Sequence, residues 1–263
     1  MNRKVFPLTG FLVVAPLAAQ DFSALQDPLV TDRPDFTESV STVPPGHYQI
    51  EAGTTFARQG DADSSSLGEV LVRIGAGERL EARLGLGSYG RVDPGLPVTG
   101  TVSGYEDPSV GLKVRLTEDD PDLLAPGHPA MALLFATTLP LGSDELTSDE
   151  WQPEAKLALS WALTDRWSLG SNLGYAYPAG EDERFHQLSA SLTAGLSLTE
   201  RLGVYLEGFG FSKESTDGSG TRYVNSGLTW LLSNDLQLDV RIGAGLDDPH
   251  PNWFAGLGAA VRF

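Results

Sequence analysis

The residues that could carry out catalysis in this chain are few and scattered. The chain has no cysteine, which excludes thiol nucleophiles, zinc-thiolate sites and disulfide frameworks. Its four histidines lie far apart, at His47, His128, His186 and His250. None stands in a pattern with Ser and Asn that suggests a nucleophile and its base, and His186 with the nearby Ser189 and Ser191 comes nearest to one. We therefore predict no catalytic residue and no enzymatic activity.

Clusters of acidic residues are the second candidate for chemistry, because hard cations bind grouped carboxylates. Such clusters occur within 144–150, 181–183 and 247–248. None has the fixed spacing and glycine of a calcium-binding loop, so we predict neither a metal site nor a cofactor. The 35 acidic residues against 18 basic ones give a net charge of −17. That balance excludes nucleic acid as a partner, since it leaves nothing to neutralise a run of phosphates.

The first nineteen residues have the pattern of a secretory signal peptide. A basic start at 1–4 precedes an apolar stretch at 5–17, and Ala18 and Ala19 supply the small residues of a cleavage site. The stretch is too short to span a bilayer as a helix. A buried N-terminal strand is the alternative interpretation. We predict that residues 1–19 are removed and that the protein leaves the cytoplasm.

The rest of the chain is patterned for strands that have one apolar face. In 236–244, every even-numbered residue is Leu, Val, Ile or Ala, while the odd positions hold Gln, Asp, Arg and Gly. This period of two is typical of β-strands. Twelve such segments follow one another, at 46–58, 67–75, 79–90, 106–117, 128–139, 151–163, 166–177, 185–197, 201–212, 221–232, 235–246 and 252–263.

The connections between these segments alternate between short turns and longer acidic or Gly/Ser-rich loops, two of them at 59–66 and 91–104. An even strand number with this alternation is the layout of an outer-membrane barrel. Aromatic residues at both ends of a strand, such as Trp167 and Tyr175, fit the two membrane interfaces. A soluble β-sandwich, the rival fold, requires neither feature. We predict an all-β protein in which residues 46–263 form a closed, twelve-stranded antiparallel transmembrane β-barrel of the bacterial outer membrane, with both ends periplasmic.

The last strand ends on Phe263, with apolar residues at every second position before it. This pattern resembles the assembly signal of bacterial outer-membrane barrels. It implies a Gram-negative host, insertion by the barrel-assembly machinery, and outer-membrane lipid and lipopolysaccharide as surroundings.

The face opposite the apolar one supplies the predicted lumen. Its charged residues are Glu51, Glu69, Arg73, Glu81, Arg83, Lys113, Arg115, Glu154, Lys156, Glu207, Asp239, Arg241 and Arg262. Five of the basic residues come from consecutive strands and would form a basic wall. One interpretation is a salt-bridged interior that satisfies the charges of a narrow barrel. The other is a polar permeation path that favours anions or polarised solutes.

The segment before the first strand is distinctive. It reads TDRPDFTES at 31–39, followed by a Pro-Gly turn and a strand that begins Tyr-Gln-Ile-Glu. Together with the turn-and-strand pattern of 163–175 and 198–208, it resembles the outer-membrane family named for the MetA pathway of phenol degradation. The resemblance covers essentially the whole mature chain. It implies a transporter-like barrel with a proposed part in the uptake of aromatic compounds, although the predicted lumen holds few aromatic residues beyond Tyr89, Tyr205, Phe209 and Tyr223.

Residues 20–45 have two interpretations. Pro34 excludes a central strand, so this is irregular chain, and the plain interpretation is a periplasmic strap. We favour a short plug in which Asp32, Arg33, Asp35 and Glu38 enter the barrel mouth and pair with lumen charges.

Three functions remain open: a channel or transporter for small solutes, a closed structural or surface-interaction barrel, and a rim enzyme. We expect the first.

Overall fold

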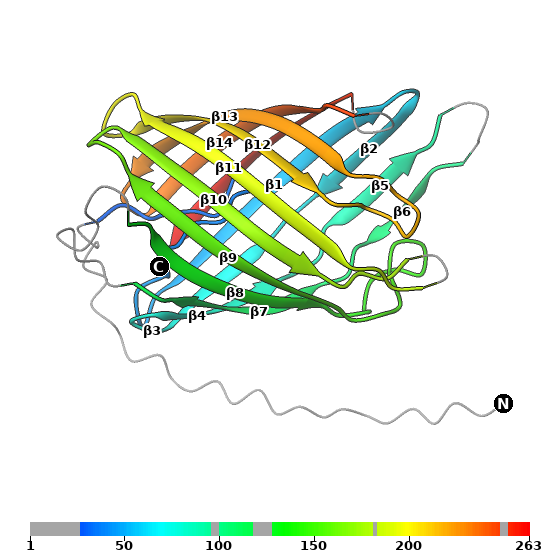
Figure 1. Ribbon diagram of the computed structural model, residues 1–263, viewed down its shortest axis with the longest axis horizontal. Helices are drawn as coiled ribbons and strands as arrows, with labels where there is room; N and C mark the ends of the chain where they lie inside the picture. The colour runs from blue at the N-terminus through cyan, green and yellow to red at the C-terminus, as the bar shows by residue number, and fades with distance from the viewer. Residues whose placement is uncertain (1–26, 96–99, 118–127, 181–182, 248–251) are drawn as a thin grey trace.

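The computed structural model describes residues 27–95, 100–117, 128–180, 183–247 and 252–263, and its described part is an all-β barrel (Figure 1). The predicted signal peptide and residues 20–26 lie outside the described residues. The strands are β1 (Tyr48–Gln59), β2 (Ala62–Leu67), β3 (Leu71–Gly77), β4 (Leu80–Gly85), β5 (Tyr89–Asp93), β6 (Val102–Tyr105), β7 (Ser109–Arg115), β8 (Ala130–Thr138), β9 (Gln152–Ala162), β10 (Trp167–Ala176), β11 (Gln187–Ser197), β12 (Leu202–Phe211), β13 (Thr221–Ser233), β14 (Leu236–Gly245) and β15 (Trp253–Arg262).

The sheet closes on itself. Strands β7 to β15 each pair with the next along the chain, and β15 returns to pair antiparallel with β1 from Gln49↔Arg262 to Arg58↔Trp253. Three of the passes that the chain makes across the barrel wall are each broken into two strands. These pairs are β2 with β3, β4 with β5, and β6 with β7, and each pair counts as one crossing. The wall therefore has twelve crossings, and the prediction of a closed, twelve-stranded antiparallel barrel is confirmed.

Two predicted loops are wrong. Residues 62–67 form β2, which pairs with the end of β1, and β5 and β6 continue the sheet within 89–105. Gly68 and Gly87 have φ of 74° and 71°, and they allow the chain to bend between β2 and β3 and between β4 and β5. The serine-rich sequence of β2 lacks apolar alternation because this hairpin extends beyond the barrel, as Figure 1 shows, and has no apolar face to bury.

The two faces of the wall differ in chemistry, as the alternation predicts. Outward side chains are apolar and exposed, among them Leu206, Ile242 and Leu257, whereas Arg73 and Lys113 are completely buried inside. Tryptophans lie exposed near the strand ends, at Trp151, Trp167, Trp230 and Trp253. Such an apolar outer surface is stable only against lipid. In the described part of the chain, no helix is long and apolar enough to cross a membrane.

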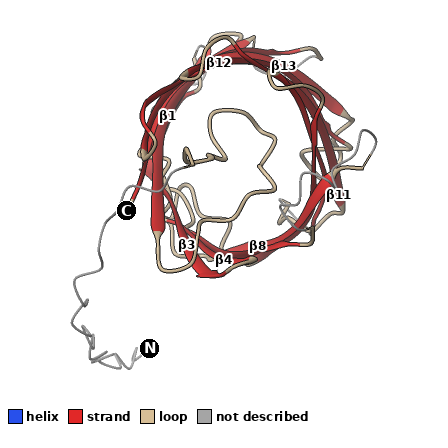
Figure 2. Cartoon of the chain, turned by 90° about the vertical axis from the view of Figure 1, so that its left-hand side faces the viewer, coloured by secondary structure: helices blue, strands red, loops and turns tan. Residues whose placement is uncertain are grey.

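The two ends of the barrel also differ. At one end, short turns join β3 to β4, β9 to β10, β11 to β12 and β13 to β14, and we call it the short-turn end. The C-terminus lies at this end (Figure 1). Residues 27–45, here called the N-terminal segment, run through the barrel interior as irregular chain (Figure 2).

Candidate functional site

An irregular chain inside a barrel has backbone groups that no strand can pair, and unpaired polar groups are costly where water is scarce. The N-terminal segment solves this with side chains of the wall. Arg73 donates to the carbonyl oxygens of Val30 and Ser41, each at 2.9 Å. The Val43 amide donates to the Glu81 carboxylate at 2.9 Å. The lumen's polar residues thus replace the hydrogen bonds of a sheet and fix the course of the segment.

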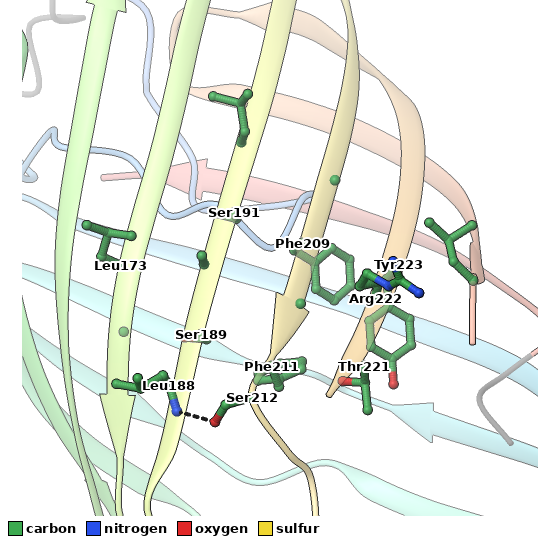
Figure 3. Close-up of a pocket in the computed structure, with 16 residues that line it drawn as sticks. Leu173, Leu188, Ser189, Ser191, Phe209, Phe211, Ser212, Thr221, Arg222 and Tyr223 are labelled. Atoms are coloured by element: carbon green, nitrogen blue, oxygen red, sulfur yellow. Dashed lines mark hydrogen bonds between the residues drawn. The ribbon is translucent and has the colours of Figure 1, made fainter. Parts of the chain in front are cut away.

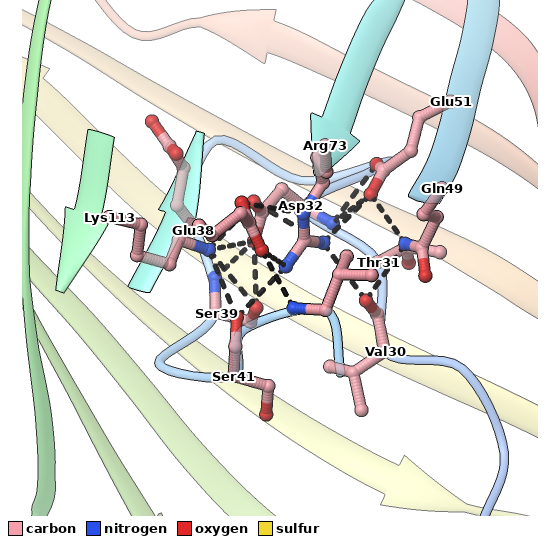
Figure 4. Close-up of polar contacts among 12 residues, drawn as sticks. Val30, Thr31, Asp32, Glu38, Ser39, Ser41, Gln49, Glu51, Arg73 and Lys113 are labelled. Atoms are coloured by element: carbon pink, nitrogen blue, oxygen red, sulfur yellow. Dashed lines mark hydrogen bonds and ion pairs between the residues drawn. The ribbon is translucent and has the colours of Figure 1, made fainter. Parts of the chain in front are cut away.

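Asp32 is the centre of the charge cluster on the β1–β7 side (Figure 4). Its carboxylate contacts Arg83 at 2.6 Å, Lys113 at 2.8 Å and Arg73 at 3.4 Å. Its backbone amide donates to both oxygens of Glu51, at 3.1 and 3.0 Å. Burial alone would raise the pKa of Asp32, but the three cations outweigh it and hold the pKa well below its usual value.

Glu38 forms the second ionic attachment of the segment. Its carboxylate contacts Arg83 at 2.7 Å and Lys156 at 2.8 Å. Its backbone is held by Asn172, whose amide oxygen accepts from the Glu38 amide at 2.7 Å and whose amide nitrogen donates to the Glu38 carbonyl at 3.1 Å. Burial opposes ionisation here too, yet Lys156 and Arg83 lower the pKa of Glu38 to about 2.

The Glu207 carboxylate on β12 holds the middle of the segment by hydrogen bonds alone. It accepts from the amides of Phe36 at 2.9 Å and Thr37 at 2.7 Å, and from the Thr37 hydroxyl at 2.6 Å. Thr193 and Asn225 donate to it from the wall, at 3.0 and 2.6 Å. Through these bonds Glu207 anchors the segment to β12.

Arg33 and Arg241 hold the segment on the β14–β15 side. Arg33 pairs with Glu69 at 2.8 Å and approaches Asp239 at 3.6 Å. Arg241 donates to the Pro34 carbonyl at 2.9 Å. The Arg33 guanidinium occupies the space that a side chain at Gly53 would fill. The wall therefore needs a glycine at this position for the segment to fit.

An aromatic stack joins the segment to β12 and β13. Phe36 stacks on Phe209 with ring centres 4.6 Å apart, and Phe209 stacks on Tyr223 at 4.8 Å. Phe211 meets the edge of Phe36 at 5.4 Å, and the Lys156 ammonium lies 5.6 Å from the centre of the Phe36 ring. Rings in this arrangement present an apolar surface inside an otherwise polar lumen.

The segment does not fill the lumen. Two hollows of about 200 and 260 Å³ flank it, and both are lined by Asp35, Ser168 and Thr193. A larger apolar hollow of about 790 Å³ lies on the outward face of β10–β13, where the exposed Leu173 and Leu188 line it, and it is not part of the lumen beside the segment (Figure 3). The space beside the segment is that of the two smaller hollows, next to β10 and β11.

The structure brings most of the predicted lumen residues into contact with the segment, including Glu69 and Asp239 through Arg33, and Arg262 through the Asp27 carbonyl oxygen at 2.8 Å. Glu154 is half-exposed and approaches Lys156 at 3.5 Å, and Glu69 follows β2 rather than lying within a strand. Arg115 donates to the Glu78 carbonyl, and Arg262 pairs with Asp235 at 2.7 Å near the short-turn end.

Several residues of the site carry no charge and were not predicted. They are Gln49, Asn172, Thr193 and Asn225, which pair with the segment or its anchors, together with Phe36, Phe211 and Gly53. Asn172 and Asn225 could have been recognised from the sequence, because each is an amide at an inward position of an alternating strand. A buried amide needs a hydrogen-bond partner, so such a position indicates a contact inside the lumen.

The residues considered for catalysis do not come together. His186 accepts or donates a 2.7 Å hydrogen bond with the Tyr175 hydroxyl at an exposed position, and His47 contacts the Pro45 carbonyl. His250, Glu181, Asp182 and Asp248 lie outside the described residues. Within the described ranges, no group of three or more His, Asp or Glu residues is placed to hold a metal ion.

Solved structures with the same fold include outer-membrane channels and porins. The COG4313 outer membrane channel from Pseudomonas putida F1 matches with a TM-score of 0.69 at 15% identity, covering 89% of this chain and 100% of that one. The NanC porin matches with a TM-score of 0.55 at 11% identity, over 81% and 98% of the two chains. The KdgM porin in complex with disordered oligogalacturonate matches with a TM-score of 0.51 at 10% identity, covering 82% of this chain and 99% of that one.

No curated protein matches the sequence. A family model does, however, match residues 31–263, from the first residue of the TDRPDFTES string to the C-terminus, and so spans the N-terminal segment as well as the barrel. The chain therefore belongs to the outer-membrane barrel family described as "Putative MetA-pathway of phenol degradation".

Proposed function

We propose that the protein is an outer-membrane channel for small solutes, in which the N-terminal segment narrows the lumen and sets what passes. The observation that carries the proposal is the pair of hollows beside the segment, about 200 and 260 Å³, within a closed barrel. A segment that filled the cross-section would leave no such space. The short turns and both chain ends would face the periplasm, and lipopolysaccharide would surround the opposite end.

The experiment is single-channel recording in a planar bilayer. We expect the wild-type protein to give discrete current steps. The double variant Asp32→Asn, Glu207→Gln weakens the anchors on both sides and should give larger steps. The matched control is Asp144→Asn with Glu145→Gln, which makes the same chemical changes at exposed loop positions.

The outcomes separate this proposal from its main alternative, a closed structural barrel. The dense charge pairing of Asp32 and Glu38 is the observation that favours a closed barrel. If neither the wild type nor the double variant conducts, the barrel is closed and the channel proposal is wrong. Nothing in the described residues supports a rim enzyme, and we propose none.

Aromatic compounds are the solutes that the lumen favours among organic molecules. The stack of Phe36, Phe209 and Tyr223 offers a flat apolar surface against which a further ring can pack. Benzylammonium should therefore interrupt the current for longer than propylammonium. Phe209→Leu should reduce that difference, and an equal effect of both amines on the wild type would refute an aromatic preference.

A further inference from the structure

The charges of the lumen divide into two groups, one on each side of the N-terminal segment. On the β1–β9 side, the basic residues Arg73, Arg83, Lys113 and Lys156 are all paired with carboxylates of the segment and the wall. The basic wall that the sequence suggests is thus neutralised. An excess of charge can remain only on the opposite side.

On the β10–β15 side, acids outnumber bases. Arg33 and Arg241 face four carboxyl groups, those of Asp35, Glu69, Glu207 and Asp239. Arg33 is already engaged by Glu69 and Asp239. Asp35 makes no ion pair with a cation in the described part of the chain, and the charged groups that act most strongly on its carboxyl, Glu207 and Asp32, are both acidic. On this side the carboxyl groups thus outnumber the guanidinium groups by four to two.

Asp35 also borders free space that contains an unpartnered oxygen. The 260 Å³ hollow is lined by Asp35, Thr193, Thr229 and Tyr205, and also by Arg33, whose guanidinium is engaged by Glu69 and Asp239. The Tyr205 side chain is more than nine-tenths buried, yet its hydroxyl has no hydrogen-bond partner. A buried polar atom without a partner at the edge of a hollow is available to bind a polar group that enters the hollow.

We propose that this hollow is a binding site for small cations, namely monovalent metal ions and primary ammonium groups, with Asp35 and Tyr205 as their ligands. An ammonium group carries three N–H donors, and the site offers carboxylate, phenol and threonine oxygens to accept them. Burial, and then the nearby Glu207, raises the pKa of Asp35 well above its usual value. A bound cation would remove that penalty.

The inference deepens the proposed channel function by naming what the channel selects, but binding at the site can be tested without conduction. The binding experiment is saturation-transfer NMR with propylammonium on the detergent-solubilised full chain. We expect binding by the wild type, loss of binding in Asp35→Asn, and weaker binding in Tyr205→Phe. The matched control Asp165→Asn alters an exposed turn at the same end of the barrel and should bind like the wild type.

The transport experiment is the reversal potential in a potassium chloride gradient at about pH 8, above the usual carboxyl range. We expect potassium to be favoured over chloride by roughly fivefold, the factor given by about 1 kcal/mol for one charge at 4 Å in water. Asp35→Asn should bring the ratio close to one, and Asp165→Asn should not.

Binding of propylammonium that is unchanged in Asp35→Asn overturns the proposal, and so does a wild-type preference for chloride. A barrel that binds propylammonium through Asp35 but conducts nothing upholds the site and refutes the channel function. A barrel that conducts without a cation preference upholds the channel and refutes the site as its selective element.

Discussion

The substitution Gly53→Ala tests whether the wall is shaped around the N-terminal segment. The three atoms nearest to a side chain added at Gly53 all belong to the Arg33 guanidinium, and the closest would overlap it. No backbone atom is among these three, so the overlap falls on a flexible side chain. Arg33 must move by about 1.4 Å to restore ordinary contact distances.

That movement weakens two interactions, the 2.8 Å pair with Glu69 and the 3.6 Å approach to Asp239. Breaking a fully buried ion pair costs about 3–5 kcal/mol. The side chains of Arg33 and Glu69 are 13% and 21% exposed, so hydration of the separated charges offsets part of this cost. We therefore expect a loss of about 1–2 kcal/mol, which corresponds to a roughly 5- to 30-fold larger population of released segment.

The assay is amide hydrogen exchange of residues 28–45 in the reconstituted barrel, which reports local opening. Exchange there should accelerate in Gly53→Ala, while the strands stay protected. Gly208→Ala is the control, because Gly208 is a strand glycine on the outer face with its nearest neighbour 3.9 Å away. In the Arg33→Ala background, Gly53→Ala should add almost nothing. Wild-type exchange in Gly53→Ala, or full additivity with Arg33→Ala, would refute the reasoning.

Three further outcomes are expected. Glu207→Gln should weaken the attachment of the middle of the segment by about 2 kcal/mol, because the neutral amide loses the charge-assisted bonds and its NH₂ group faces the backbone amides of Phe36 and Thr37, which are donors too. Unaltered hydrogen exchange at residues 36–37 would contradict this. The pKa of Glu38 is lowered from 4.5 to about 2, so its contribution to the stability of the attached segment should be complete above about pH 4.5 and be lost as the pH falls toward 2. Cleavage of the segment by an acid protease should therefore increase over this pH range, and Glu38→Gln should remove that pH dependence. Deletion of Phe263, which stacks on Tyr48 with ring centres 5.1 Å apart, should impair outer-membrane insertion, and normal assembly would argue against a terminal signal.

The barrel was predictable because lipid and lumen impose opposite chemistry on alternating residues. Every strand longer than eight residues begins and ends within two residues of its predicted position, and most of them show that alternation. The β2 and β5–β6 extensions were not predictable in the same way. They project beyond the apolar layer, so their pairing depends on backbone hydrogen bonds that leave little pattern in the side chains.

The site was less accessible from sequence than the barrel. Alternation predicts that Arg73 and Lys113 point inward, but not which carboxylate each one meets. Asp32 lies 41 residues before Arg73 and 81 before Lys113, so the pairing depends on the path of an irregular segment. For that reason the sequence leaves both interpretations of the basic wall open, a salt-bridged interior and an anion-favouring path: it shows the bases of the wall, whereas much of the neutralising acid comes from the segment.

The way the segment is held bears on whether it can move. Its apolar attachment is small, with Leu29 and Val43 buried and Val40 packed against the Ala132, Leu134 and Ala158 cluster. The Phe36 ring adds its stack on Phe209, and the remaining hold is ionic and hydrogen-bonded, centred on Asp32 and Glu207. Buried ion pairs are specific in geometry but add little net stability, because desolvation offsets much of their attraction. A segment held in this way has one defined position and a modest barrier to leaving it. An apolar plug of the same size would be held more strongly and less specifically, so the chemistry of the lumen favours an adjustable constriction over a permanent seal.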